Sequence, residues 1–282
     1  MLTLREIKAR TEPFFKEKGV PNPVLDFDLL LARVLGVKRL ELYLDLDRPL
    51  TEAQLEELRP WVKRRANREP LQHIMGILEF GGLELCVDSR ALIPRPETEE
   101  LLEWIWGQNN PPARILDLGT GSGALSLSLA KAFPEATVTA TDVSEDALAL
   151  ASENADRNGL GERVNFLQGS WWEPITEGSL FELIVSNPPY LTEAEFESAE
   201  SEVKEFEPTE ALVSGVDGMD ALRVIFADAK RFLAPEGMLA LETGIAQSEA
   251  LNACAEEAGL TGETIEDFSG RPRFYIVGHK SS

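Results

Sequence analysis

The residues with the clearest chemical meaning are Asn187-Pro188-Pro189-Tyr190, which follow an apolar run at 183–186. An amide nitrogen is a poor nucleophile because its lone pair is delocalised into the carbonyl. We expect the Asn187 side-chain carbonyl and the Pro188 backbone carbonyl each to accept one N–H of an NH₂ group, which aims the nitrogen at a methyl donor. The prolines restrict the backbone, and Tyr190 can stack on the planar group. The alternative is a proline-rich turn that closes a strand.

A glycine-rich loop, with Gly119, Gly121 and Gly123, follows a second apolar segment at 115–118. Glycines let the backbone turn tightly and approach a ligand closely. Asp117 can reach a charged amino-acid moiety, and Asp142 can accept from ribose hydroxyls. These features favour S-adenosylmethionine as the ligand. The spacing also satisfies the G-x-G-x-x-G/A pattern of dinucleotide-binding proteins, and a ligand-free turn is a third interpretation.

The segments that must position both motifs alternate between strand and helix from residue 114 onward. Such alternation predicts an α/β fold with a mostly parallel sheet covered on both faces, whose carboxyl edge carries the two motifs. The predicted strands are 115–118, 138–141, 164–168, 183–186, 238–241 and 274–277, and the predicted helices are 124–133, 144–158, 219–232 and 247–258.

The first part of the chain predicts a separate helical domain. Gly36 ends an apolar helical face, and a capping box at 51–54 opens a helix that runs toward Arg68 before Pro70. A hairpin with Gly81-Gly82 at its turn follows, and Glu97 begins another helix through Trp106. We therefore expect a helical domain at 1–75, a hairpin linker at 76–95 and a methyltransferase domain at 96–282.

The charge is divided in the same way. Residues 1–95 carry 16 Lys and Arg against 15 Asp and Glu, a net of +1, whereas residues 96–282 carry 11 against 34, a net of −23. So acidic a surface repels a phosphate backbone and disfavours a nucleic-acid substrate, although adaptation to salt explains it equally well. The basic cluster Lys63-Arg64-Arg65 with Arg68 is interpreted as a solvated face, or alternatively as a docking patch.

Three expectations rest on what the sequence lacks. The first residues contain no long apolar run with a cleavage site, and no stretch of 18 apolar residues occurs, so we expect a cytoplasmic protein that does not span a membrane. Two distant histidines, His73 and His279, without a cysteine pattern suggest no metal site.

The chain resembles the PrmC/HemK family, the N5-glutamine methyltransferases of peptide-chain release factors. The glycine loop is generic to methyltransferases, and Asn-Pro-Pro-Tyr is shared with adenine-N6 DNA methyltransferases. The segment Leu92-Ile-Pro-Arg-Pro-Glu-Thr-Glu99 is far more specific. The other matching segments are 69–76, 117–123, 187–190, 207–218 and 270–273. The chain departs from the family at His73, at Gly81, at Pro235-Glu236-Gly237 and at Glu242-Thr243-Gly244, where packing details are in question.

The resemblance implies a Rossmann-like class I methyltransferase domain joined by a β-hairpin to a small N-terminal helical domain that recognises the substrate. The implied substrate is the glutamine of the Gly-Gly-Gln motif in class-1 release factors, with S-adenosylmethionine as cofactor. We also expect a monomer that binds no nucleic acid directly. A ribosomal-protein glutamine, an adenine-N6 nucleic-acid acceptor and a dinucleotide oxidoreductase remain as alternatives.

The resemblance also assigns site residues by motif position. Trp171 would flank the adenine, and Asn187 would touch both cofactor and substrate. Arg95 and Glu97 would shape the entrance of the pocket. The cofactor would be held by Asp117, Gly119, Thr120, Gly121, Ser122, Gly123 and Asp142, and the glutamine by Pro188, Pro189 and Tyr190.

Overall fold

The computed structural model describes residues 2–108 and 110–280, which form two compact units. The first unit comprises the chain up to Gly76 together with Glu200–Phe206, and the second comprises Ile77–Ala199 and the chain from Glu207 onward. The segment 200–206 therefore belongs with the helical unit, although it lies far along the sequence from it. In the described residues no helix is long and apolar enough to cross a membrane.

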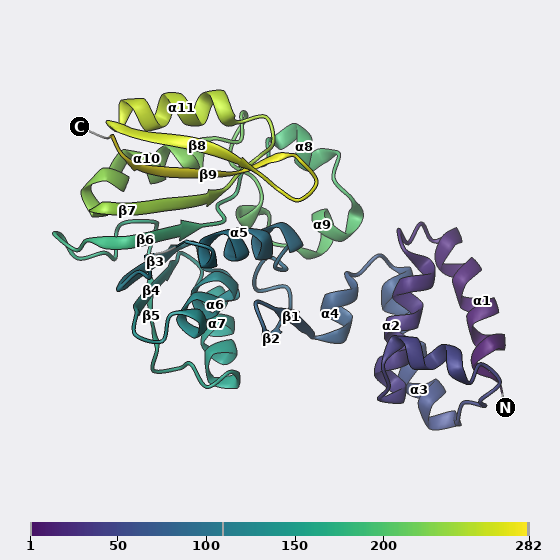
Figure 1. Cartoon of the computed structure of the whole chain (residues 1–282). Helices are drawn as coiled ribbons and strands as arrows, with labels where there is room; N and C mark the ends of the chain where they lie inside the picture. The colour runs from purple at the N-terminus through teal and green to yellow at the C-terminus, as the bar shows by residue number, and fades with distance from the viewer. Residues whose placement is uncertain (1, 109, 281–282) are drawn as a thin grey trace. The chain divides into compact units, whose positions relative to one another are not determined.

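The first unit is helical (Figure 1). Its core is built around Phe15 and Phe27, whose rings meet edge to face with centroids 6.1 Å apart. Both expected end signals form, because Gly36 takes a left-handed conformation after the second helix and Thr51 forms a capping box with Gln54. The helices are α1 (Leu4–Glu17), α2 (Pro23–Leu35), η1 (Arg39–Leu44), α3 (Glu52–Ala66), α4 (Leu71–Met75) and α9 (Ser201–Phe206).

The helix expected to run to Arg68 ends at Ala66 instead, because Arg68 has a positive φ of 67° that no α-helix continues. The basic cluster is a solvated face only in part, because Lys63 is exposed whereas Arg65 and Arg68 are engaged in ion pairs. Arg65 is 4% exposed and lies 2.7 Å from Asp26 and 2.8 Å from Glu202. Since Arg68 also pairs with Glu202, acidic partners within this unit neutralise both guanidinium groups.

The second unit contains a seven-stranded sheet of order β5-β4-β3-β6-β7-β9-β8, whose first five strands are parallel and whose last two pair antiparallel. A two-stranded hairpin of β1 (Ile77–Phe80) and β2 (Leu83–Cys86) precedes it. The sheet strands are β3 (Arg114–Leu118), β4 (Thr137–Asp142), β5 (Val164–Gln168), β6 (Phe181–Ser186), β7 (Leu233–Glu242), β8 (Leu260–Glu266) and β9 (Pro272–His279).

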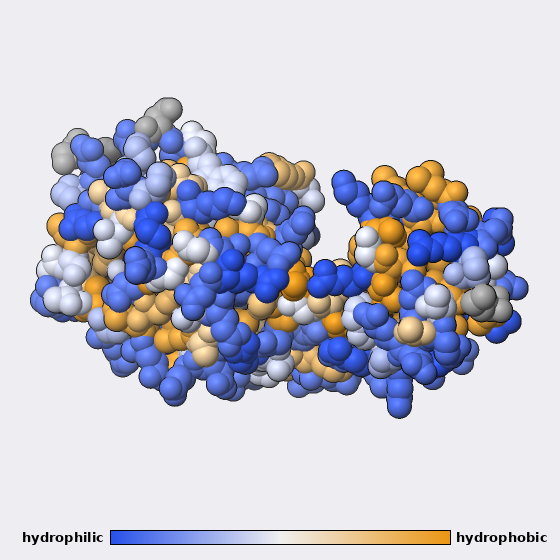
Figure 2. Space-filling view, turned by 90° about the horizontal axis from the view of Figure 1, so that it is seen from below, coloured by the Kyte–Doolittle hydropathy of each residue, from blue (hydrophilic) through white to orange (hydrophobic). Residues whose placement is uncertain are grey.

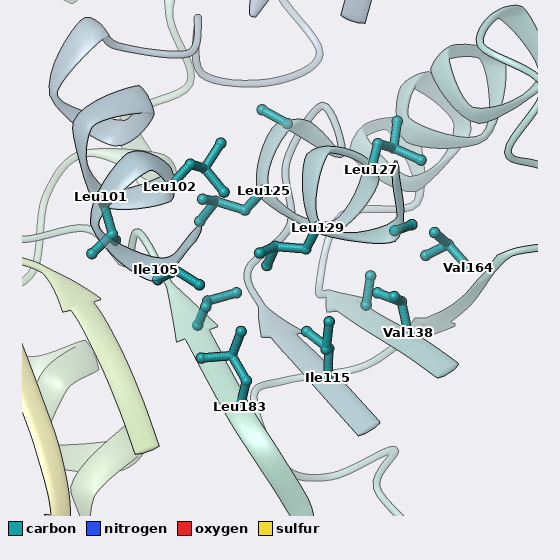
Figure 3. Packing of buried hydrophobic residues seen from close by; sticks show 14 of the residues in the cluster. Leu101, Leu102, Ile105, Ile115, Leu125, Leu127, Leu129, Val138, Val164 and Leu183 are labelled. Carbon is teal, nitrogen blue, oxygen red and sulfur yellow. The ribbon is translucent and has the colours of Figure 1, made fainter. Parts of the chain in front are cut away.

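Helices cover both faces of this sheet, as the alternation predicts (Figure 1). One face packs Ile115 and Leu183 against α5 and α6, which contribute Leu101 and Leu125 among others (Figure 3). Their neighbours Leu116 and Ile184 point to the other face, because successive strand residues alternate. The helices of this unit are α5 (Pro96–Trp106), α6 (Ala124–Ala132), α7 (Glu145–Arg157), α8 (Glu193–Glu197), η2 (Thr209–Ala211), α10 (Asp220–Phe232) and α11 (Ser248–Glu257).

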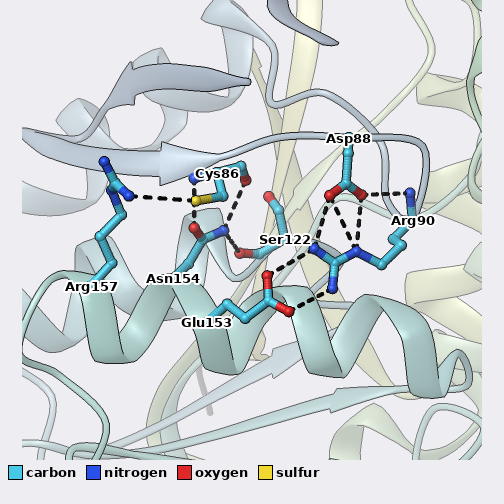
Figure 4. A network of polar contacts seen from close by, with 7 residues as sticks. All are labelled: Cys86, Asp88, Arg90, Ser122, Glu153, Asn154 and Arg157. Carbon is cyan, nitrogen blue, oxygen red and sulfur yellow. Dashed lines mark hydrogen bonds and ion pairs between the residues drawn. The ribbon is translucent and has the colours of Figure 1, made fainter. Parts of the chain in front are cut away.

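The hairpin is fastened to α7 by two asparagines one helical turn apart. Asn154 accepts from the Cys86 backbone N–H at 2.6 Å and donates to the Cys86 carbonyl at 3.0 Å (Figure 4). Asn158 makes the same pair of bonds with Glu84. Four helical residues rise about 6 Å and two strand residues about 6.6 Å, so the two spacings match. Asn154 also donates to the Ser122 carbonyl at 2.9 Å, which ties the hairpin to the glycine loop.

The expected elements of this unit all form, with ends that differ by a few residues. The sequence interpretation did not include β8, α8 or η2. Strand β8 lies at the sheet edge and holds a glycine and several exposed polar residues, so it lacks an apolar run. Hydrophilic residues also predominate on the face of the molecule shown in Figure 2, in keeping with the acidic composition.

Candidate active site

A cavity of about 460 Å³ opens at the carboxyl edge of the parallel strands, within the second unit. Small-molecule sites typically measure roughly 300–1,000 Å³, and in doubly wound folds they lie at this edge where the strand order reverses. Here the order reverses between β3 and β6. Each of four parallel strands contributes residues to the lining at its carboxyl end, namely 119–122 for β3, 142–144 for β4, 169–171 for β5 and 187–189 for β6.

The glycine loop brings its backbone to the cavity surface. Gly119 and Gly121 have φ values of +72° and +56°, which residues with a Cβ rarely adopt. A Cβ on Gly119 would lie 3.5 Å from the Trp171 ring, so this aromatic side chain lies over the loop. Gly123 does not line the cavity, because it caps α6, where a Cβ would come within 3.0 Å of Leu127.

Asp117 lies beneath the loop and is fully buried. Its Oδ2 accepts from Thr120 Oγ1 at 2.6 Å and from the Ser126 backbone N–H at 3.1 Å, whereas Oδ1 has no hydrogen-bond partner among the residues that the structure describes. Burial raises the Asp117 pKa to about 6 against the lowering effect of the two donors. Asp117 is not part of the cavity lining, and an oxygen without a partner is costly for a buried carboxylate.

Asp142 does line the cavity and is held in place by backbone donors. Its Oδ2 accepts from the Gly121 N–H at 2.8 Å and its Oδ1 from the Ser144 N–H at 2.9 Å. Burial raises the pKa of Asp142, and these N–H groups oppose that shift. Each carboxylate oxygen offers two lone pairs, so Asp142 keeps acceptor capacity for hydroxyl groups of a ligand.

Trp171 lines the cavity in the segment after β5 and has a positive φ of 48°. A bulky side chain with a left-handed backbone is a strained arrangement, and such strain persists where the surrounding structure requires it. The Trp171 carbonyl accepts a hydrogen bond from Thr141 Oγ1 at 3.4 Å. The left-handed backbone of Trp171 thus accompanies an indole ring that lies against Gly119 of the glycine loop.

Asn187, Pro188 and Pro189 line the same cavity, directly after β6. Asn187 Nδ2 donates to Thr98 Oγ1 at 3.1 Å, and Thr98 Oγ1 donates to the buried Glu242 at 2.5 Å. Within the described residues, Asn187 Oδ1 receives no hydrogen bond. The structure thus leaves a carbonyl oxygen available at the cavity, as the chemistry proposed for this motif requires.

Tyr190 points away from the lining and into the protein. Its hydroxyl donates to Glu242 at 3.1 Å, and the Arg273 guanidinium lies 5.7 Å from its ring centroid. Burial, with the Glu242 carboxylate as a further cause, raises the Tyr190 pKa above its ordinary value. In this arrangement the Tyr190 hydroxyl anchors the segment 187–190 to Glu242 rather than facing the cavity.

Arg95 and Glu97, expected at the entrance, are engaged in ion pairs beside the lining. Arg95 lies 2.6 Å from Glu207 and Glu97 lies 3.0 Å from Arg271. Three buried groups were not identified from the sequence: Thr98, Glu207 and Glu242. Thr98 and Glu207 fall inside segments that match the family, whereas Glu242 lies in one that departs from it, and nothing in the local pattern of any of the three indicates the contacts it makes.

Comparison with known proteins agrees with this architecture. Residues 6–76 match the family described as PrmC N-terminal domain, and residues 98–205 match the methyltransferase small domain. The chain is 43% identical to the release factor glutamine methyltransferase of Geobacter sulfurreducens, over 98% of this chain and 96% of that protein. It is 42% identical to the protein of the same name from Deinococcus radiodurans, over 97% of each.

Solved structures share the fold at low sequence identity. A methyltransferase from Pyrococcus furiosus superposes with a TM-score of 0.52 at 20% identity, covering 71% of this chain and 90% of that one. A Thermus thermophilus 16S rRNA methyltransferase in complex with AdoMet and guanosine gives a TM-score of 0.52 at 20% identity, covering 73% of this chain and 50% of that one. The near-complete match to the two bacterial relatives decides the family: this chain belongs to the release factor glutamine methyltransferases.

Proposed function

We propose that this protein transfers a methyl group from S-adenosylmethionine to the side-chain amide nitrogen of the glutamine in the Gly-Gly-Gln motif of class-1 peptide-chain release factors. The observation that carries the proposal is the free Oδ1 of Asn187 at the cavity, next to Pro188, at the strand end adjoining the glycine loop. The names of the full-length relatives supply the substrate class. Such a substrate would be met in the cytoplasm.

The lining residues fit S-adenosylmethionine. Gly119 and Gly121 offer exposed backbone, Asp142 has acceptor capacity for ribose hydroxyls, and Trp171 offers a flat surface for adenine. Asp117 lies beneath the glycine loop and outside the lining, so its negative charge would attract the cationic amino group of the methionine part from behind the loop. When bound, this cofactor supplies an electrophilic methyl group on a sulfonium, so the protein need only place the acceptor nitrogen.

Asn187 and Pro188 would perform that placement. The Asn187 Oδ1 and the Pro188 carbonyl oxygen each accept one N–H of the substrate carboxamide, which favours the positive charge that develops on nitrogen. With the cofactor bound, the amide nitrogen would take its methyl group and release one N–H proton to water, and the cofactor would leave as the neutral thioether. Holding the amide in this geometry would lower the activation free energy, because the nitrogen and the methyl group no longer have to be brought together and aligned from solution.

The test is to incubate the protein with methyl-labelled S-adenosylmethionine and a class-1 release factor, and to map the label by mass spectrometry. We expect it on the glutamine of the Gly-Gly-Gln motif. Label on another residue would refute the assignment. Ribosomal proteins and a duplex oligonucleotide belong in the same assay as competing substrates, and the net charge of −23 over 96–282 predicts that the duplex is not modified.

A further inference from the structure

Four side chains form an unbroken series of hydrogen bonds within the second unit, and two of them, Asn187 and Thr98, line the cavity. Tyr190 Oη donates to Glu242 Oε1 at 3.1 Å, Thr98 Oγ1 donates to Glu242 Oε2 at 2.5 Å, and Asn187 Nδ2 donates to Thr98 Oγ1 at 3.1 Å. Thr98 comes from the first turn of α5, Glu242 from the end of β7, and the other two from the segment after β6. Thr98 is 3% exposed and Glu242 is 1% exposed, so water does not compete for these bonds.

We propose that Glu242 is a positioning residue for Asn187, and that it acts through the Thr98 hydroxyl to decide which end of the Asn187 amide faces the cavity. A carboxylate only accepts hydrogen bonds, so the single hydroxyl proton of Thr98 is committed to Glu242. Thr98 then has only lone pairs to offer. The NH₂ end of Asn187 must therefore face Thr98, and the carbonyl end faces the cavity.

This orientation matters because an asparagine amide is nearly symmetric in shape and its two ends differ only in hydrogen-bonding character. With the amide reversed, Asn187 would present N–H donors to the N–H donors of the substrate carboxamide. The inference rests on the proposed function for the identity of that substrate. The order of acceptors and donors from Glu242 through Thr98 to Asn187, called the relay from here on, follows from the protein alone.

The burial of Glu242 supports a role beyond packing. Within the described residues Glu242 forms no ion pair closer than 4 Å, and an unpaired buried carboxylate is expensive. Burial raises its pKa, whereas the bonds from Thr98 and Tyr190 and the positive charge of Arg273 favour the ionised form, and Glu97 opposes it. Of the side chains of this shape, only a carboxylate offers a separate acceptor oxygen to each of the two donors.

The decisive variant is Glu242→Gln, which keeps the shape and introduces a donor. The introduced NH₂ can donate to Thr98 while its carbonyl still accepts from Tyr190. The Thr98 hydroxyl would then turn its proton to Asn187 and reverse the amide. We expect kcat for methyl transfer to the release factor to fall roughly 10- to 100-fold.

Thr98→Val interrupts the relay without reversing it, so we expect a smaller loss, of about 2- to 10-fold. In the double variant E242Q/T98V the reversal has no route to Asn187, and kcat should equal that of Thr98→Val alone. Losses that multiply would show that the two residues act independently and would overturn the proposal.

Two further variants serve as controls. Thr98→Ser restores the hydroxyl and should recover most of the activity. Thr243→Val removes an equally buried hydroxyl that bonds the Arg273 carbonyl, and serves as the matched control for folding.

A second readout needs neither cofactor nor substrate. In nuclear magnetic resonance spectra of the free protein, the Asn187 side-chain amide protons should show cross-peaks to the Thr98 methyl group, and Glu242→Gln should abolish them. Identical cross-peaks in both proteins would overturn the relay even if turnover fell. Conversely, if the cross-peaks behave as expected but the release factor is not methylated, the proposed substrate fails and the relay stands.

Discussion

Glu207 holds Arg95 by an ion pair of 2.6 Å, with the Glu207 side chain 1% exposed. The other Glu207 oxygen accepts from the Ile93 backbone N–H at 3.1 Å. These bonds join the segment that enters η2 to the segment that enters α5, and both segments contribute to the cavity wall.

Glu207→Ala should therefore destabilise the protein and loosen the wall. The change leaves the Ile93 N–H and the Arg95 guanidinium without their acceptor, which costs about 1–3 kcal/mol for each buried group that stays unpaired. Glu207→Gln retains an acceptor for Ile93 and should lose less. Urea unfolding of the three proteins measures the difference, and equal midpoints for Ala and Gln would contradict it.

Asn187→Ala should abolish most of the turnover while the fold persists. The variant removes one of the two acceptors that hold the substrate amide, and loss of one such group typically costs about 10²–10³ in kcat. Stability should change by less than about 1 kcal/mol, because the lost bond to Thr98 lies at the cavity edge. Methyl-transfer kinetics and thermal unfolding check the two parts. Unchanged turnover would dispose of the role of Asn187.

Trp171 allows its ring and its backbone to be tested separately. Both Trp171→Ala and Trp171→Gly remove the aromatic surface and should weaken S-adenosylmethionine binding by about 10-fold, a loss on the scale of one aromatic contact. Only glycine relieves the positive φ of 48°, so Trp171→Gly should be about 1 kcal/mol more stable than Trp171→Ala.

Calorimetric titration with S-adenosylmethionine and thermal unfolding separate the two effects. An alanine variant as stable as the glycine variant would show that the backbone is not strained. Binding equal to that of the unmodified protein would remove Trp171 from the cofactor site.

The sequence alone predicted the strands around the site because their signals are local. A continuous apolar run marks β6, Ile115, Leu116 and Leu118 mark β3, and Ser144 caps α7 by accepting a hydrogen bond from the Ala147 N–H. The loops that follow these strands had to meet at one edge, since parallel strands share their carboxyl ends. Asp142 and Asn187 both line the cavity at this edge, and the roles expected of them there stay predictions.

What could not be predicted depends on contacts between distant segments. Glu242 lies 144 residues from Thr98 and 55 from Asn187, and no periodicity records which hydroxyl reaches which carboxylate. The segment 200–206 joins the helical unit through Glu202, whose partners Arg65 and Arg68 had been assigned to solvent or to a docking surface. The sequence gives the sign of each side-chain charge, but it does not show which residue that charge pairs with.

The two asparagines on α7 form a matched pair for measuring how burial scales a hydrogen bond. Asn154 and Asn158 make equivalent bonds to β2, but Asn154 is fully buried and Asn158 is half-buried. Asn154→Ala should cost about 2–3 kcal/mol, because the Cys86 groups and the Ser122 carbonyl lose a partner in a dry environment. Asn158→Ala should cost about 1 kcal/mol, since water can replace its bonds. Urea unfolding compares them, and equal losses would contradict the effect of burial.

Asp117 should make stability fall as pH rises. Its pKa is raised from 3.8 to about 6 in the folded protein by burial. Between pH 3.8 and 6 the folded state therefore binds more protons at Asp117 than the unfolded state does. The contribution of Asp117 to the free energy of unfolding is largest below about pH 4 and is lost as the pH rises through 6. Relative to Asp117→Asn, which cannot titrate, the protein should lose on the order of 2 to 3 kcal/mol across this window.

The measurement is urea unfolding of both proteins from pH 4.5 to 7.5, taken as the difference between them so that the other carboxylates cancel. Thr120→Val provides the second arm. The Thr120 hydroxyl lowers the Asp117 pKa by donating to the carboxylate, so removing it should move the decline to higher pH. A difference that stays constant with pH, or a Thr120→Val curve that moves toward acid, would show that the carboxylate beneath the glycine loop is not destabilised by burial.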